Sequence, residues 1–127
     1  MKNLLLLSAL TVILASGCKE NKKAELRFCA DVVAQNPCVG EDTVFNLGTK
    51  VWAQLFLPEG YADTAVVGNL FGYPEGFKVF IETKVHTLSK GQTIVMEPIF
   101  SIRCGKFEVE FLDTQGNLLD SRLFRIR

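Results

Sequence analysis

Short runs of alternating apolar and polar residues, divided by turn signals, fill the chain from Ala24 to its end. The clearest run places Phe107, Val109 and Phe111 between charged residues. A period of two is typical of a strand with one buried face, and this region shows no 3.6-residue period of an amphipathic helix. The sequence therefore predicts an all-β domain.

Seven strand regions follow from these runs, and we expect them at residues 26–33, 43–57, 65–71, 77–85, 93–102, 107–111 and 118–126. Gly48 marks a bulge or kink within the second region. Pro98 favours an edge position or a bulge for the fifth, because proline cannot donate a hydrogen bond to a neighbouring strand. Short strands separated by frequent turns predict a two-sheet antiparallel β-sandwich.

Length and composition agree with one such domain and exclude several functions. A chain of 127 residues, with 48% hydrophobic residues and ten Phe, can fill one core but not two, and it is not disordered. Its 14 basic and 14 acidic residues cancel, which argues against nucleic-acid binding. A single His and the lack of a C-x-x-C spacing argue against a metal site.

The N-terminus has the layout of a secretory signal peptide. Lys2 supplies a positive charge, and an apolar run from Leu4 to Ala15 follows, interrupted only by Ser8 and Thr11. This run is too short to span a bilayer comfortably as a helix. We therefore expect residues 1–17 to be a cleaved signal peptide.

The segment Leu14-Ala15-Ser16-Gly17-Cys18 resembles the lipobox of bacterial lipoproteins. The resemblance implies cleavage before Cys18, an acyl lipid on its sulfur and acylation of its new amine, so that two or three chains hold the protein firmly in a membrane. Residues 18–25 would then be the lipidated Cys and a charged tether, and residues 26–127 the sandwich. Lys19 favours the outer membrane, with the membrane side left open. The alternative is an ordinary signal peptide with an incidental Cys18.

The C-terminal run resembles the last hairpin of immunoglobulin-like domains in bacterial envelope proteins. The likeness rests on residues 105–111, Asp113, Gly116, Leu119 and Phe124. It implies an immunoglobulin-like fold and transfers no binding residue. The Cys…Trp…Cys pattern of antibody domains is absent around Trp52.

With Cys18 assigned to lipid, Cys29, Cys38 and Cys104 remain, and export predicts one disulfide and one free thiol. In a sandwich whose strands alternate in direction, the first and fifth connections fall at the same end. Cys38 and Cys104 lie in these connections and are the leading pair. The next possibility is Cys29 with Cys38, if residues 29–38 fold back as a local hairpin. In the first case Cys29 is an inert, half-buried thiol in a strand.

No residue set indicates catalysis. His86 would lie at a strand end, with Glu82 on the same face but about 13 Å along the strand, so we expect a surface or edge histidine. No Ser stands in a G-x-S-x-G elbow. Glu108 and Glu110 would face outward, where Arg122 and Arg125 on the next strand neutralise them. We therefore expect no enzyme and no catalytic residue.

Aromatic residues near strand ends are the remaining candidates for a binding site, because exposed aromatics often anchor binding surfaces. They are Tyr61, Phe71 and Tyr73. Two Pro-Glu-Gly-aromatic turns, at residues 58–61 and 74–77, would fall at opposite ends of the sandwich. The expected function is a membrane-anchored, non-catalytic binding or accessory module in the envelope, with a protein or glycan partner and no cofactor besides the acyl lipid on Cys18. The alternative is an inhibitor of an envelope-directed hydrolase.

Overall fold

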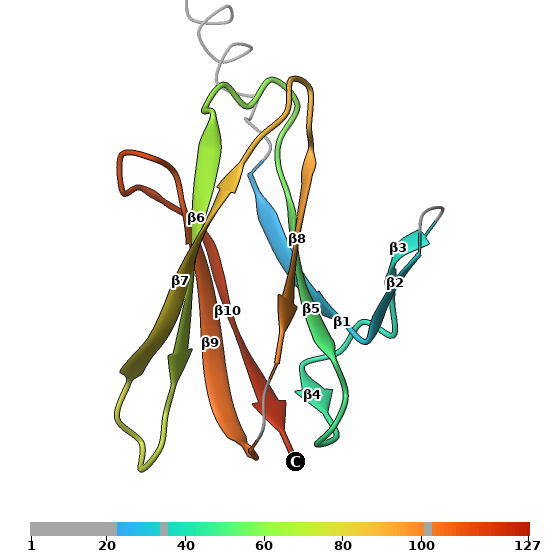
Figure 1. The fold of residues 1–127 in the computed structure, drawn as a ribbon, viewed down its shortest axis with the longest axis vertical. Helices are drawn as coiled ribbons and strands as arrows, with labels where there is room; N and C mark the ends of the chain where they lie inside the picture. Colours follow the sequence, from blue (N-terminus) through green and yellow to red (C-terminus); the bar gives the residue numbers. More distant parts are fainter. Residues whose placement is uncertain (1–22, 34–35, 101–102) are drawn as a thin grey trace, which may run out of the picture.

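The computed structural model describes residues 23–33, 36–100 and 103–127, which form ten strands and no helix (Figure 1). The strands are β1 (Glu25–Cys29), β2 (Asp31–Val33), β3 (Asn36–Val39), β4 (Val44–Phe45), β5 (Val51–Phe56), β6 (Ala65–Gly72), β7 (Val79–Thr87), β8 (Ile94–Ile99), β9 (Gly105–Leu112) and β10 (Leu118–Ile126). The predicted all-β class is confirmed. Within these ranges no helix is long and apolar enough to cross a membrane.

Two sheets face each other and enclose the core (Figure 1). One contains β1-β5-β8, and the other contains β4-β10-β9-β6-β7. Neighbouring strands are antiparallel, except that β4 runs parallel to β10. This order is that of an immunoglobulin-like sandwich. A separate hairpin of β2 and β3 projects from the side of the first sheet.

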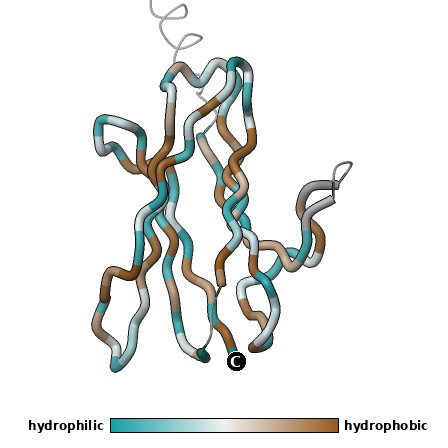
Figure 2. Tube along the Cα trace, in the orientation of Figure 1, coloured by the Kyte–Doolittle hydropathy of each residue, from teal (hydrophilic) through white to brown (hydrophobic). Residues whose placement is uncertain are grey.

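The core forms because one residue in two on the inner strands is apolar. In β6, buried and partly buried residues alternate along the whole strand. Phe124 of β10 joins the sheets: its ring centroid lies 4.8 Å from that of Phe28 on β1 and 5.3 Å from that of Phe107 on β9. Figure 2 shows the same alternation as bands of apolar and polar residues along the central strands.

The fourth predicted strand, β7, lies beside β6 in the five-stranded sheet, with Val66 opposite His86. The short turn at residues 73–78 explains this, because strands joined by a short connection pair as a hairpin. The three-stranded sheet therefore has no strand opposite β7. One side of the sandwich lies open between β7 and β8, the edge strands of the two sheets.

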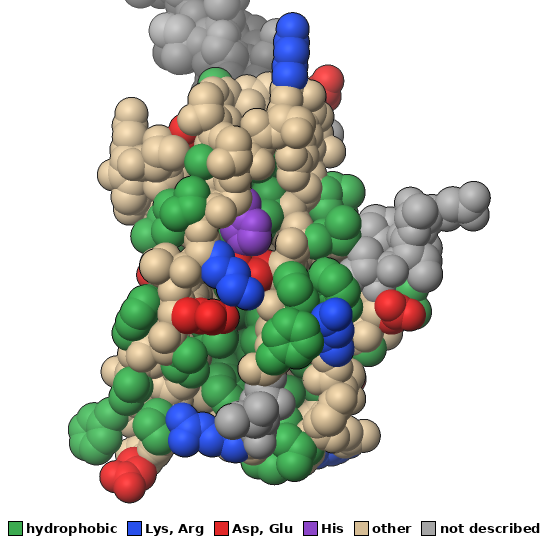
Figure 3. Space-filling view, in the orientation of Figure 1, with side chains coloured by type: hydrophobic (Ala, Val, Ile, Leu, Met, Phe, Trp, Pro, Cys, Tyr) green, Lys and Arg blue, Asp and Glu red, His purple; other side chains and the backbone are tan. Residues whose placement is uncertain are grey.

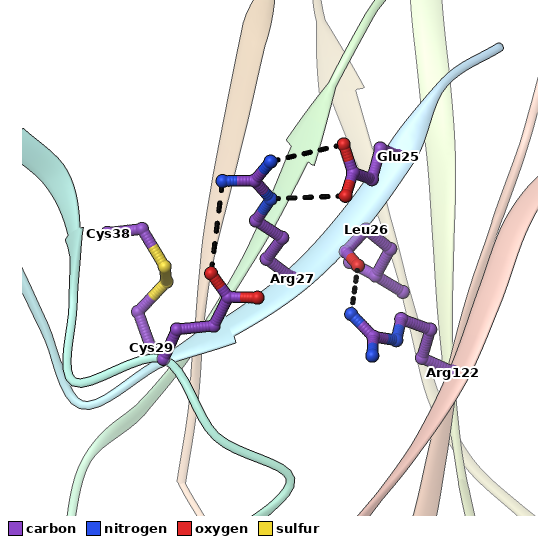
Figure 4. Close-up of a disulfide and its surroundings, with 7 residues drawn as sticks. Glu25, Leu26, Arg27, Cys29, Cys38 and Arg122 are labelled. Atoms are coloured by element: carbon purple, nitrogen blue, oxygen red, sulfur yellow. Dashed lines mark hydrogen bonds and ion pairs between the residues drawn. A yellow bond between two sulfur atoms is a disulfide. The ribbon is translucent and has the colours of Figure 1, made fainter.

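The other side of the sandwich is closed by side chains. The Leu26 N–H donates to Asp120 Oδ2 at 2.8 Å. Arg122 Nη1 donates to the Leu26 carbonyl at 3.0 Å (Figure 4). Arg122 lies opposite Val109, and Arg125 lies opposite Lys106. The predicted pairing of these arginines with Glu108 and Glu110 is therefore wrong, because Arg122 points inward to the first sheet.

Candidate binding surface

Two of the three predicted aromatic anchors lie together on the outer face of the five-stranded sheet. The alternation of β6 turns Phe71 outward, and Tyr73 follows at the strand's end. Lys78 Nζ lies 4.3 Å from the Phe71 ring centroid, and Lys106 Nζ lies 4.7 Å from that of Tyr73. Ammonium groups at these distances are attracted to the ring faces.

The carboxylate of Glu108, on β9, links Tyr73 to Lys78, the cation that lies over the Phe71 ring. Glu108 accepts a hydrogen bond from the Tyr73 hydroxyl at 2.9 Å and an ion-paired one from Lys78 Nζ at 2.8 Å. Partial burial opposes ionisation of Glu108, but the bonds from Lys78 and Tyr73 outweigh it and hold its pKa below the ordinary value. The same contacts raise the pKa of Tyr73 and of Lys78. We call Phe71, Tyr73, Lys78, Lys106 and Glu108 the Glu108 cluster.

Replacing Tyr73 with Phe is expected to raise the pKa of Glu108 toward its ordinary value, because one hydrogen bond to the carboxylate is lost. A carboxyl with a lowered pKa in the folded state stabilises the fold above its unfolded pKa, and this contribution disappears as the pH falls through the folded pKa. The variant should thus lose that contribution at a higher pH. NMR titration of the Glu108 carboxyl carbon measures the shift. Tyr61→Phe is the control, and an equal shift in both variants would contradict the assignment.

The β6–β7 hairpin carries an exposed apolar segment. Phe77 is 75% exposed, and Val79, Phe80 and Ile81 are also largely exposed; we call these four residues the hairpin patch. This part of the hairpin lies at the lower left, with hydrophobic residues brown in Figure 2 and green in Figure 3. The turn before it places Glu75 at φ 98°, a left-handed conformation that non-glycine residues rarely adopt. The hairpin patch and the Glu108 cluster share this end of the sandwich.

Tyr61, the third predicted anchor, lies at the opposite end. It lines an open groove of about 820 Å³ together with Lys23, Phe56 and Lys90. Burial raises the pKa of Tyr61, as do the nearby charges of Asp63 and Asp113, and its hydroxyl has no hydrogen-bond partner among the described residues. The two Pro-Glu-Gly-aromatic turns thus lie at opposite ends, as the sequence predicts (Figure 1).

The open side of the sandwich holds a contact that the sequence does not predict. His86 Nε2 on β7 lies 2.7 Å from Glu97 Oε1 on β8, and Glu97 is only 3% exposed. Gly68 makes room for this carboxylate, because a Cβ there would lie 3.0 Å from Oε1. Figure 3 shows the histidine between the sheets, with acidic and basic side chains beside it. His86 therefore lies on an edge strand, as the sequence predicts, but it has a close partner in Glu97 and links the two sheets.

In residues 23–33, 36–100 and 103–127, no three His, Cys, Asp or Glu side chains are grouped to hold a metal ion. Lys84, the nearest cation on β7, contacts the Pro98 carbonyl at 3.5 Å and the Glu82 carboxylate at 3.7 Å. The arrangement is that of a polar bridge between two sheet edges.

The disulfide joins Cys29 and Cys38 (Figure 4). Cys104 is free and exposed. The leading prediction, Cys38 with Cys104, is wrong, and so is the half-buried Cys29 thiol. The chain reverses after β1 and the β2–β3 hairpin brings Cys38 back to Cys29, with Cα atoms 5.3 Å apart. Cys18 lies outside the described residues.

Replacing Cys29 and Cys38 together with Ala is expected to lower the free energy of unfolding by about 2.5 kcal/mol, because the unfolded chain loses a short closed loop. Urea unfolding without reductant measures this loss. Cys104→Ala is the matched control and should change stability by less than about 0.5 kcal/mol. A loss in the control as large as the loss in the double variant would restore the Cys38–Cys104 pairing.

Comparison with known protein families finds no match to this chain, and comparison with curated proteins finds none either. The function therefore has to be argued from the residues themselves. Among the described residues, the most distinctive candidate for binding is the end of the sandwich that carries the hairpin patch and the Glu108 cluster.

Proposed function

We propose that this chain is a lipoprotein of the cell envelope, anchored in the outer membrane by acyl chains on Cys18, and that its sandwich is a non-catalytic binding module. The lipobox-like segment before Cys18 supports the anchor. The hairpin patch supports binding, because monomeric proteins rarely leave contiguous large apolar side chains exposed without a partner. This patch is the observation that carries the proposal.

The position of the patch favours a partner that lies away from the membrane. Lys23, where the described chain begins, lines the groove beside Tyr61, whereas the β6–β7 turn lies at the other end (Figure 1). The five residue steps from Cys18 to Lys23 span at most about 17 Å. A short tether then holds the Tyr61 end near the membrane and points the hairpin patch outward.

The chemistry of this end favours a protein over a glycan. Phe77, Val79, Phe80 and Ile81 are apolar side chains that a protein partner would bury at the centre of an interface. The charges of the Glu108 cluster lie beside them, as in a polar rim around an apolar centre. Anchoring would raise the local concentration of the domain near such a partner.

Inhibition of an envelope-directed hydrolase is the second candidate function. It needs a projecting loop with a side chain that enters a cleft, and Phe77 on the β6–β7 hairpin has that form. Glu75 and Gly76, the two residues before it, both have left-handed backbone conformations. Phe77→Ser would abolish inhibition in that case.

The anchor is tested by replacing Cys18 with Ser. We expect wild-type protein in the membrane fraction, labelled by a fatty-acid probe, and the variant unlabelled and released from the membrane. Protease treatment of intact cells, with a periplasmic protein as the protection control, then assigns the membrane side. Unchanged membrane association of Cys18→Ser would contradict the lipid anchor.

The binding role is tested with a photo-crosslinking amino acid placed at residue 77 in cells. Leu118, which is exposed at the β9–β10 turn, is the matched control position. A discrete protein adduct at residue 77 and none at residue 118 is expected. Adducts at both positions or at neither would contradict a specific surface at the hairpin patch.

A further inference from the structure

We propose that β7 is a docking edge at which two copies of this chain pair antiparallel, about a two-fold axis through Thr83. The pairing would join two five-stranded sheets into one continuous sheet. This inference concerns the folded domain and does not rest on the lipid anchor.

The hydrogen bonds of β6 fix which groups of β7 face outward. Tyr73 N–H donates to the Lys106 carbonyl on the β9 side, and Leu88 N–H donates to the Thr64 carbonyl on the β7 side. Backbone groups alternate in direction along an antiparallel strand. The N–H and C=O groups of Thr83, Val85 and Thr87 therefore point away from β6, and no described residue bonds to them.

The long free edges of the other sheet are occupied. On β1, the Leu26 N–H and C=O bind Asp120 and Arg122. On β8, Pro98 has no N–H, and the Pro98 carbonyl accepts a bond from Lys84. An unprotected strand edge is a template for another strand, so β7 is the edge most open to pairing.

Apolar side chains of β7 near this edge are also uncovered. On the outer face Val85 is 66% exposed and Phe80 is 55% exposed, and Ile81, beside Gly72 on the inner face, is exposed as well. These residues lie on either side of the charged pair Glu82 and Lys84, whose side chains are themselves partly exposed. A second strand on this edge would remove apolar surface from water and satisfy the free backbone groups.

The charges of β7 select a second copy as the occupant. An axis through Thr83 places Glu82 of each copy opposite Lys84 of the other, which gives two attractive pairs. An axis at Glu82 or Lys84 would set like charges against each other, and an axis at Val85 would set Lys84 against His86. Only the Thr83 register among these four is self-complementary.

The pairing sets the two chains in opposite directions along β7. The two Lys23 ends would then point to opposite ends of the dimer. In a lipid-anchored protein, both ends reach one membrane only when β7 lies along the membrane surface. The anchored form would therefore lie on its side as a dimer and stand upright as a monomer.

Cross-linking of the full chain tests the register. In a Cys104→Ser background, Thr83→Cys places two thiols opposite each other at the axis, and Leu123→Cys on β10 is the exposed control. The detergent-extracted protein is treated with a mild oxidant. We expect a disulfide-linked dimer with Thr83→Cys alone. Equal cross-linking at both positions, or none at Thr83→Cys, overturns the proposal.

Charge reversal tests the choice of occupant. Lys84→Glu should weaken dimerisation by about 30-fold, because both attractive pairs become repulsive, and adding Glu82→Lys should restore it. Sedimentation equilibrium measures both, and thermal unfolding checks that each variant folds. Val85→Pro is the independent variant, since it removes an outward N–H and should also yield monomers. A wild-type monomer, or a dimer that is unaffected by Lys84→Glu, overturns the proposal.

Discussion

Replacing Phe124 with Ala is expected to lower the free energy of unfolding by about 4 kcal/mol. Phe124 is 1% exposed, and its ring contacts Phe28 on the opposite sheet and Phe107 on the neighbouring strand. Removing the ring leaves a cavity between the sheets, which the rigid strands around it cannot fill. Urea-induced unfolding followed by circular dichroism measures the loss.

Leu123→Ala is the matched control for this experiment. Leu123 precedes Phe124 in β10 but is 44% exposed, because the alternation of the strand turns it outward. Its replacement should cost less than about 0.5 kcal/mol. Similar losses in the two variants would mean that β10 does not bury the face assigned here.

The β9–β10 hairpin could be predicted from sequence because its information is local. The alternation of Phe107, Val109 and Phe111 fixes the buried face, and the Gly116 turn fixes the pairing that sets Phe107 opposite Phe124. A strand pattern of this kind needs no knowledge of the rest of the chain. The two-sheet architecture follows from repeating the same argument over the remaining runs.

The disulfide could not be predicted with the same security because it depends on a chain reversal inside an apolar run. Residues 26–33 alternate as one strand would, yet the chain leaves the sheet after Cys29 and returns through β2 and β3. The pattern carries no mark of that reversal. The sequence therefore left Cys38 with two possible partners.

The sequence pattern also did not reveal which residues of β7 face the core. The sequence alternates Val79, Ile81 and Val85 with charged residues, which is typical of a buried apolar face. The structure exposes these three residues. The register shift opposite Leu70 and Phe71 changes the phase of the strand, so that Ile81 lies beside Gly72 on the inner face and Val85 lies on the outer face. Lys84 and His86 turn toward β8, and apolar surface is left free for a partner.

The residues that contact the predicted aromatic anchors are set by the pairing register of β6 and β9, which spacing along the sequence does not show. Phe71 and Tyr73 could be named as candidates, but Lys106 and Glu108 meet them only through the β6–β9 pairing. Glu97 did carry a signal. It alternates in phase with Val95 and Ile99, which places a carboxylate on a buried face and implies a partner for it.

Replacing His86 with Leu is expected to lower the free energy of unfolding by about 3 kcal/mol near neutral pH, because it leaves the buried Glu97 carboxylate without its bond. Leucine matches the size of the imidazole, so little of this loss comes from packing. Urea unfolding of the variant near neutral pH measures the loss.

The double variant His86→Leu with Glu97→Leu separates the charge from the packing. It should regain most of the lost stability, because an apolar pair of similar volume replaces the His86–Glu97 contact and leaves no unpaired polar group. Thr87→Leu, at the neighbouring exposed position, is the control for the substitution itself. If the single and double variants are equally unstable, the loss comes from packing, and the His86–Glu97 contact is not what holds the open side of the sandwich together.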